Sequence, residues 1–193
     1  ALQNFLAANP DNFLASLGIL LVLSGVAFKI GGFPFQIWVP DVYQGAPTPI
    51  TAFLSVGSKA AGFIVLWRFL TPFLVAEAIA PKILLILAFV TGATLLVGNL
   101  AAIGQSNFKR LLAYSSIAHA GFILLGIVGG APLSTIGFYL GAYLFMTIIA
   151  FAVLAVIRVN TGSDELVAFD GLAKRSPFLA FALVIAMSSL AGV

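Results

Sequence analysis

The sequence contains no cysteine and only one histidine. Without thiols the chain can form no disulfide, and it cannot supply the thiolates that hold an iron–sulfur cluster. Charged residues are also scarce, since Asp, Glu, Lys and Arg together make up 8% of the chain. The nine Lys and Arg residues are scattered, and no basic run indicates nucleic-acid binding.

Apolar side chains dominate instead. Hydrophobic residues make up 62% of the 193 positions, and the mean hydropathy is +1.17. This composition is far too apolar for a soluble domain of that length. The sequence therefore predicts an integral membrane protein that lies in a lipid bilayer.

Long apolar runs divide the chain into membrane spans. A bilayer core is about 30 Å thick and needs roughly 20 residues of helix to cross it. Five runs meet this requirement, and an incomplete sixth begins at Pro177; the five are 13–31, 49–71, 83–103, 111–129 and 133–157. The runs are continuous and much longer than the alternating strands of a membrane barrel. We predict an all-α polytopic transmembrane helix bundle.

The two ends of the sequence suggest a piece of a longer protein. The chain begins at Ala1 without a methionine, shows no signal peptide, and stops at "SSLAGV" inside an apolar run. We expect residues 1–193 to be a fragment of a single membrane domain, with five full transmembrane helices and part of a sixth.

Basic residues near the span ends predict the orientation, because cytoplasmic loops are enriched in Lys and Arg. Five lie on one side and two on the other. The side with five is assigned to the cytoplasm: Lys109, Arg110, Arg158, Lys174 and Arg175, against Arg68 and Lys82.

A helix break is predicted at the end of the first span. The stretch "FKIGGFPF" places Gly31, Gly32 and Pro34 shortly after Lys29. Glycine tolerates unusual dihedral angles and proline removes a backbone donor, so the helix should end there. Broken helices at membrane depth line cavities and mark ion sites in transporters. The carbonyls that end the half-helix favour a cation such as the Lys29 ammonium.

Lys59 is the second lysine that no loop accounts for. It follows the start of its span, at position 49, by about 15 Å at 1.5 Å per residue. Burial disfavours a charged ammonium and a neighbouring carboxylate favours it, so a buried lysine can gain or lose a proton as its surroundings change. We expect Lys29 and Lys59 to be buried proton-relay groups. The alternative for each is a static ion pair or a bond to backbone carbonyls.

His119 lies about 12 Å into the fourth span and is a third relay candidate. Imidazole both accepts and donates protons near neutral pH. Ser115 and Ser116 lie on the same helix face, where a hydroxyl or a trapped water could bond a ring nitrogen. The alternative is a neutral histidine that joins helices by hydrogen bonds.

Other polar residues are expected to be structural or solvated. Thr135, Tyr139, Tyr143 and Thr147 recur every four residues as a stripe on the fifth span. Hydrogen bonds between helices, or an aromatic belt, explain this stripe better than the lining of a water path. Residues near span ends are expected to be solvated: Glu77, Asn99, Asp164, Glu165 and Asp170.

Three stretches carry a family resemblance: "FKIGGFPFQIWVPDVYQGAPTPITAFLSVGSKAAGFIVLWRF", "NFKRLLAYSSIAHAGFILLGIV" and "LAKRSPFLAFALVIAMSSLAGV". With the spacing of Lys29 and Lys59, they resemble the antiporter-like membrane subunits of respiratory complex I. Within that family they most resemble the subunit N type of NADH:quinone oxidoreductase. The resemblance covers essentially the whole chain.

The resemblance implies an antiporter-like inverted-repeat fold, of which this chain would hold roughly the seventh to the start of the twelfth helix. It also implies that Lys29 belongs to the first broken helix, that Lys59 is the connecting lysine, and that His119 lies on the central polar axis. Redox chemistry elsewhere would change the charge of a carboxylate near Lys29 and drive a proton through Lys59 towards His119. That carboxylate, and the exit group of a second broken helix, would lie outside this sequence.

The resemblance further implies no cofactor in this chain, since flavin, iron–sulfur clusters and quinone would belong to partner subunits. The implied partners are other membrane-arm subunits, and the implied location is the bacterial inner membrane, with the thylakoid or mitochondrial inner membrane as alternatives. Rival interpretations are a subunit of a multi-subunit Na+/H+ antiporter or membrane-bound hydrogenase, a non-conducting scaffold, and a quinone-binding subunit. The stretch "WVPDVYQGAPTP" favours the subunit N type over the antiporter and hydrogenase subunits, and the depth of His119 argues against quinone binding.

Overall fold

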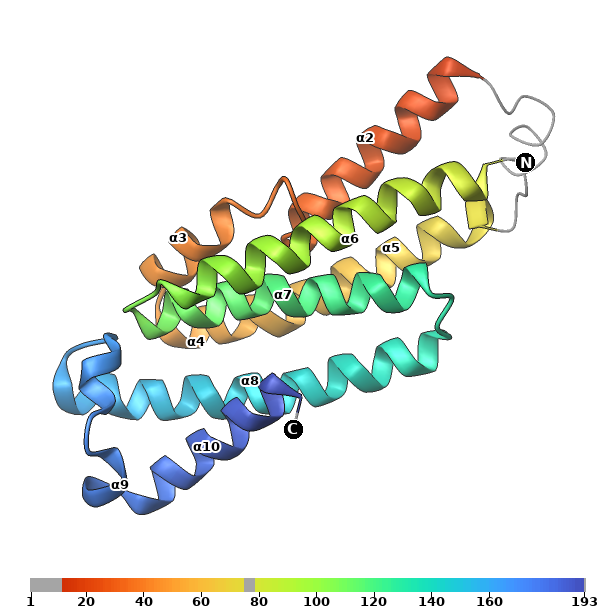
Figure 1. Cartoon of the computed structure of the whole chain (residues 1–193). Coiled ribbons are helices and arrows are strands. Elements are labelled where there is room, and N and C mark those ends of the chain that lie inside the picture. The colour runs from red at the N-terminus through yellow and green to blue at the C-terminus, as the bar shows by residue number, and fades with distance from the viewer. Residues whose placement is uncertain (1–11, 75–78, 193) are drawn as a thin grey trace.

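The computed structural model describes residues 12–74 and 79–192. Within these ranges the chain is built from helices and forms no β-strand. Helices α8 and α10 lie on one side of the bundle formed by α2 to α7, as Figure 1 shows. Five spans are long and apolar enough to cross a membrane. The predicted all-α transmembrane bundle is confirmed.

The first span ends at the predicted break. Helix α2 covers Phe13–Ile30, and Gly31 follows in the left-handed conformation with φ 73°. The Gly31 N–H bonds back to the carbonyls of the last turn, and Gly32 N–H donates to Ala27 O at 2.8 Å. This C-cap favours glycine because residues with a side chain rarely adopt a positive φ. The structure places Gly31, Gly32 and Pro34 in the turn that separates α2 from α3.

The backbone groups freed by the break find partners in neighbouring elements. Helix α3 spans Trp38–Gly45, and the Trp38 Nε1–H donates to Phe28 O at 3.0 Å. The Phe33 N–H donates to Thr94 Oγ1 of α6 at 2.9 Å. Such bonds are required at membrane depth, where no water satisfies a stranded amide.

The second span contains a distortion that the sequence did not predict. Helix α4 (Thr48–Phe53), the π-helix η1 (Leu54–Ser58) and α5 (Lys59–Leu74) follow one another without a gap. A π-helical turn accommodates an extra residue in a helix and is frequent at functional sites. This one ends directly at Lys59.

Three further spans follow: α6 (Ala80–Ile103), α7 (Phe108–Val128) and α8 (Leu133–Thr161). Helix α7 begins before its predicted span because Asn107 Oδ1 caps it, accepting the Arg110 N–H at 3.2 Å. A 3-10 turn, η2 (Leu166–Phe169), and the short α9 (Leu172–Arg175) lead to α10 (Pro177–Ala191), which runs back along α8 (Figure 1).

Helix α7 forms the centre of the bundle and lies very close to α6. A Cβ added at Gly98 of α6 would lie 2.6 Å from Ala118 N, and one at Gly121 of α7 would lie 2.7 Å from Leu95 Cγ. Small residues allow membrane helices to approach in this way. The tight contact sets the position of α7 along α6. Helix α7 carries Ser116 and His119.

Candidate functional site

A row of buried polar side chains runs through the interior of the bundle, from α3 and α4 through α5 to α7. Each member is less than a tenth exposed: Tyr43, Thr48, Thr51, Ser55, Lys59, Ser116 and His119. Polar groups at this depth require hydrogen-bond partners within the protein.

Lys59 is 3% exposed and lies against α7. Its Nζ donates to the backbone oxygen of Ser116 at 2.6 Å and to Ser116 Oγ at 3.0 Å. In residues 12–74 and 79–192 no carboxylate lies within ion-pair distance of this ammonium. Of the static alternatives, the structure shows a bond to a backbone carbonyl and no ion pair, and the relay role stays a prediction.

His119 lies 7% exposed beyond Ser116 on α7. Its Nδ1 lies 2.7 Å from the Tyr139 hydroxyl, and its ring centroid lies 4.8 Å from that of Tyr143. The imidazole therefore faces two tyrosines of α8.

Ser116, one of the two serines predicted as a possible partner of His119, bonds elsewhere. The Ser116 hydroxyl donates to Ala113 O at 2.8 Å and accepts from Lys59, so it is already engaged. The stripe on α8 behaves as expected at Tyr139, which bonds across helices. Thr135, at one end of the stripe, is exposed.

A cavity of about 310 Å³ opens beside His119. Its walls include Tyr139 and Tyr143 of α8 and the end of α10 at Ser189 and Leu190. A cavity with several polar partners can hold water. The lining supplies such partners at His119, Tyr139 and Ser189 among apolar side chains.

Lys29 lies in the last turn of α2 and is exposed, so the predicted burial of this lysine is wrong for this chain. Helix α2 lies at the edge of the bundle, with only 17% of its residues buried, against 61% for α7. The stem of Lys29 packs near α5, where a Cβ at Gly62 would lie 3.3 Å from Lys29 Cγ. Gly62 is one turn from Lys59, but among the described residues Lys29 bonds to neither Lys59 nor His119.

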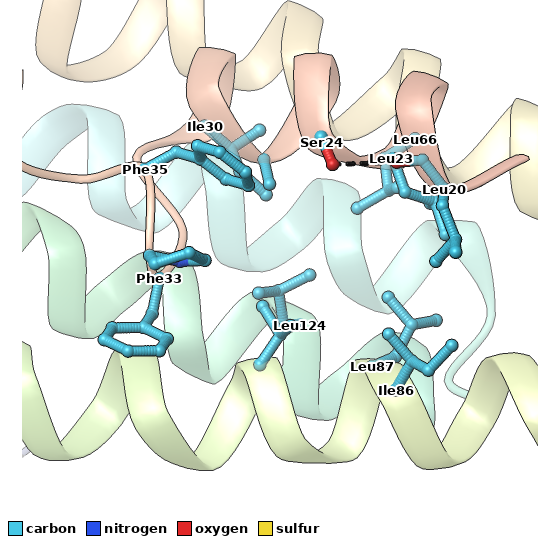
Figure 2. A pocket seen from close by; sticks show the side chains of 13 residues that line it. Leu20, Leu23, Ser24, Ile30, Phe33, Phe35, Leu66, Ile86, Leu87 and Leu124 are labelled. Atoms are coloured by element: carbon cyan, nitrogen blue, oxygen red, sulfur yellow. Dashed lines mark hydrogen bonds between the residues drawn. The ribbon is translucent and has the colours of Figure 1, made fainter. Parts of the chain in front are cut away.

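A second cavity, of about 90 Å³, lies beside the helix break, between α2 and α6 (Figure 2). Leu20, Leu23, Phe33 and Leu124 are among the side chains that face it. Its one side-chain hydroxyl, that of Ser24, bonds to Leu20 O of its own helix at 2.8 Å. Because its lining is almost entirely apolar, this cavity is not part of the polar row.

Charged residues meet at the end of the bundle where α3, α4, α7 and α8 have their loops. Lys109 is fully buried, and its Nζ lies 3.0 Å from Ala46 O and 3.4 Å from Asp164 Oδ2. Arg158 Nη1 contacts the same Asp164 oxygen at 2.8 Å. The sequence analysis counted Lys109 among the basic residues near span ends and did not predict its burial, which follows because Asp164 of the loop 162–171 lies against it.

The predicted solvation of the acidic residues holds only in part. The Asp164 side chain is 12% exposed, and its Oδ1 is buried with no hydrogen-bond partner among the described residues. It is drawn inward because the Phe108 N–H donates to Asp164 O at 2.8 Å. Three other members of that group are exposed as predicted, namely Asn99, Glu165 and Asp170. Glu77 lies outside the described residues.

Comparison with known proteins assigns the family. A family model described as "NADH:quinone oxidoreductase/Mrp antiporter, TM" matches residues 1–193. The chain belongs to this transmembrane family. The predicted resemblance, the antiporter-like fold and the multi-pass membrane location are confirmed.

Several individual proteins and solved structures are similar to this chain. NADH-quinone oxidoreductase subunit N 1 of Opitutus terrae is 51% identical over 209 residues, a match covering 100% of this chain and 39% of the relative. A chain of respiratory complex I from Thermus thermophilus is 40% identical with a TM-score of 0.79, covering 95% of this chain and 40% of that chain. A chain of the Mrp complex from Dietzia sp. is 27% identical with a TM-score of 0.83, covering 96% and 35% respectively. This chain thus spans about two fifths of the length of its curated relatives.

Sequence reasoning missed the buried polar residues that precede Lys59 on its own span. Thr48, Thr51 and Ser55 precede it by helical steps of three or four and are all buried. Polar residues at this spacing inside an apolar span are the signal that could have identified them. Among the described residues no group of three or more His, Cys, Asp or Glu could hold a metal ion.

Proposed function

We propose that this chain is the central part of an N-type, antiporter-like subunit in the membrane arm of a proton-translocating NADH:quinone oxidoreductase. It would correspond to roughly the seventh to the start of the twelfth helix of that subunit. The similarity to subunit N of Opitutus terrae supports the assignment. One structural observation carries it: Lys59 is buried in a membrane span, and in the described part of the chain its ammonium has only neutral partners.

Such a lysine suits proton transfer. A lysine beside a carboxylate leaves an uncompensated negative charge when it loses its proton, whereas the carbonyl and hydroxyl of Ser116 carry no charge to strand. The proton would pass from Lys59 towards His119, which can accept at one ring nitrogen while the other is paired with Tyr139. Water in the adjoining cavity would carry it onward.

The driving force would come from outside this chain. Lys29, at the exposed end of α2, would respond to a carboxylate on another segment whose charge changes with redox chemistry in the complex. At an effective dielectric constant of about 20, a unit charge ~7 Å away alters the energy of a neighbouring charge by roughly 2 kcal/mol. Moving one charge across 100 mV costs about 2.3 kcal/mol, so the two energies are comparable.

The proposal also covers partners and location. Flavin, iron–sulfur clusters and quinone would be held by other subunits, and this chain would contact neighbouring membrane-arm subunits. The relatives from Opitutus terrae and Thermus thermophilus are bacterial proteins named as NADH-quinone oxidoreductase subunit N 1 or as part of respiratory complex I, which supports the bacterial inner membrane as the location.

The test is proton pumping by the intact complex in proteoliposomes, with the full-length subunit carrying Lys59→Met. Electron transfer is measured in the same preparation, and Lys174→Met, which removes an exposed lysine, is the matched control. We expect Lys59→Met to stop or strongly reduce pumping while the control pumps normally. Normal pumping by Lys59→Met in an assembled complex would instead support the non-conducting scaffold.

The second candidate is a subunit of a multi-subunit Na+/H+ antiporter. The structural likeness to a chain of the Mrp complex favours it, although the identity is 27%, against 40% for the complex I chain. The two functions differ in their dependence on sodium. Proton movement that requires Na+ in the opposite direction, without electron transfer, would favour the antiporter.

A further inference from the structure

We infer that the buried ion pair between Lys109 and Asp164 positions the Lys59 site, which makes these two residues positioning residues for the proton transfer proposed above. The inference rests on the proposed function, because it concerns the same site. Neither residue touches the Lys59 ammonium. They act through the junction between α3 and α4.

Lys109 holds this junction directly. Its side chain is fully buried, and its Nζ lies 3.0 Å from Ala46 O, the carbonyl that follows α3. A buried ammonium needs a counter-charge, and Asp164 Oδ2 supplies it at 3.4 Å. The charge of Asp164 therefore keeps Lys109 on the Ala46 carbonyl.

The junction is linked to Lys59 through two side chains. The Thr51 hydroxyl of α4 lies 3.2 Å from both Tyr43 O and Pro47 O and 3.4 Å from Ala46 O, so its single proton is shared among the carbonyls of this junction. The Tyr43 hydroxyl lies 3.4 Å from Ser116 Oγ, which accepts from Lys59. Helix α3 is thus fixed to α7 at both Lys109 and Ser116, two helical turns or about 10 Å apart.

The loop 162–171 completes the arrangement and connects it to α10. The Leu166 N–H donates to Ser106 O at 2.8 Å, and Asn107 Nδ2 donates to Glu165 Oε1 at 3.2 Å. The loop leads through α9 to α10, whose end at Leu190 lines the cavity beside His119. Figure 1 shows the loop at the end of the bundle where α3 and α4 meet. The loop therefore contacts the start of α7 beside Lys109, and the helix that follows it lines the cavity beside His119.

The experiment removes the charges together, because Asp164→Asn alone strands a fully buried Lys109 and could prevent folding. The full-length subunit carries Lys109→Met with Asp164→Leu in the intact complex. Apolar replacement of a buried ion pair commonly preserves assembly. Asp164→Glu, which keeps the charge, and the exposed Lys174→Met are the controls, and protons pumped per electron transferred are measured.

We expect the apolar pair to assemble and to pump between about tenfold and a hundredfold less, the range that a displacement of ~1 Å at a reacting group produces. Asp164→Glu should retain pumping. An apolar pair that pumps like the parent overturns the inference, since packing alone would then suffice. Lys59→Met, measured beside such an apolar pair, shows which statement has failed. If Lys59→Met abolishes pumping, only the positioning role of Lys109 and Asp164 fails. If Lys59→Met also pumps normally, the proposed function itself fails.

Discussion

Replacing Lys59 with methionine should leave the protein as stable as before, or more stable, although it removes two short hydrogen bonds. Bonds to a charged donor contribute about 1.5–3 kcal/mol each. Against this stands the cost of desolvating an ammonium, which is several kcal/mol even after relaxation. Methionine has a similar length and leaves no donor stranded, because Ser116 Oγ keeps its bond to Ala113 O at 2.8 Å. We expect a net change between about 0 and 2 kcal/mol in favour of the variant.

Asp164→Asn is the comparison variant for Lys59→Met. We expect it to lower the free energy of unfolding, whereas Lys59→Met should leave it unchanged or raise it. Asp164→Asn leaves Lys109 fully buried with neutral acceptors and without its counter-charge. Breaking a buried ion pair in this way costs about 3–5 kcal/mol. Thermal unfolding of the intact complex, with the full-length subunit carrying each change, measures the difference in midpoint. If Lys59→Met lowered the midpoint of thermal unfolding as much as Asp164→Asn does, the reasoning would be refuted. A loss of that size would mean that Lys59 also has a counter-charge.

Three further predictions concern single contacts. Tyr139→Phe removes the partner of His119 Nδ1, and we expect proton pumping to fall by roughly tenfold or more with electron transfer measured alongside. Thr94→Val strands an amide at the helix break and should cost about 1–3 kcal/mol in thermal unfolding, whereas Thr94→Ser should not. Gly98→Val forces α6 away from α7 and should cost about 1–3 kcal/mol, whereas Gly92→Ala, where a Cβ meets nothing within 4 Å, should not.

The features predictable from the sequence are those set by local chemistry and by solvent. Apolar run length decides the spans, because a helix must cover the bilayer thickness. The glycines and the proline of "GGFP" end a helix wherever they stand, so the break at Gly31 was predictable from residue type alone. The depth of Lys59 follows from its distance along a span.

The features that were mispredicted depend on which helices lie beside one another. A sequence places Lys109 near a span end but does not show that the loop 162–171 folds over it. Lys29 was expected to be buried because it lies at membrane depth, yet burial depends on helices that cover α2. Ser116 was assigned to His119 by helical spacing, whereas its partner comes from α5. The π-helix before Lys59 has no recognisable signal in "LSVGS".

Lys59 and Lys109 show how much the partner of a buried lysine matters. Both ammonium groups are almost completely buried, and both donate to a backbone carbonyl. Lys109 also faces Asp164, so loss of its proton would leave a carboxylate that only the half-exposed Arg158 compensates. Lys59 faces only neutral groups of Ser116 among the described residues, so the proton release that we propose for it would strand no opposite charge. The presence of a carboxylate, and not the depth of burial, therefore separates the lysine that holds backbone in place from the one suited to exchange a proton.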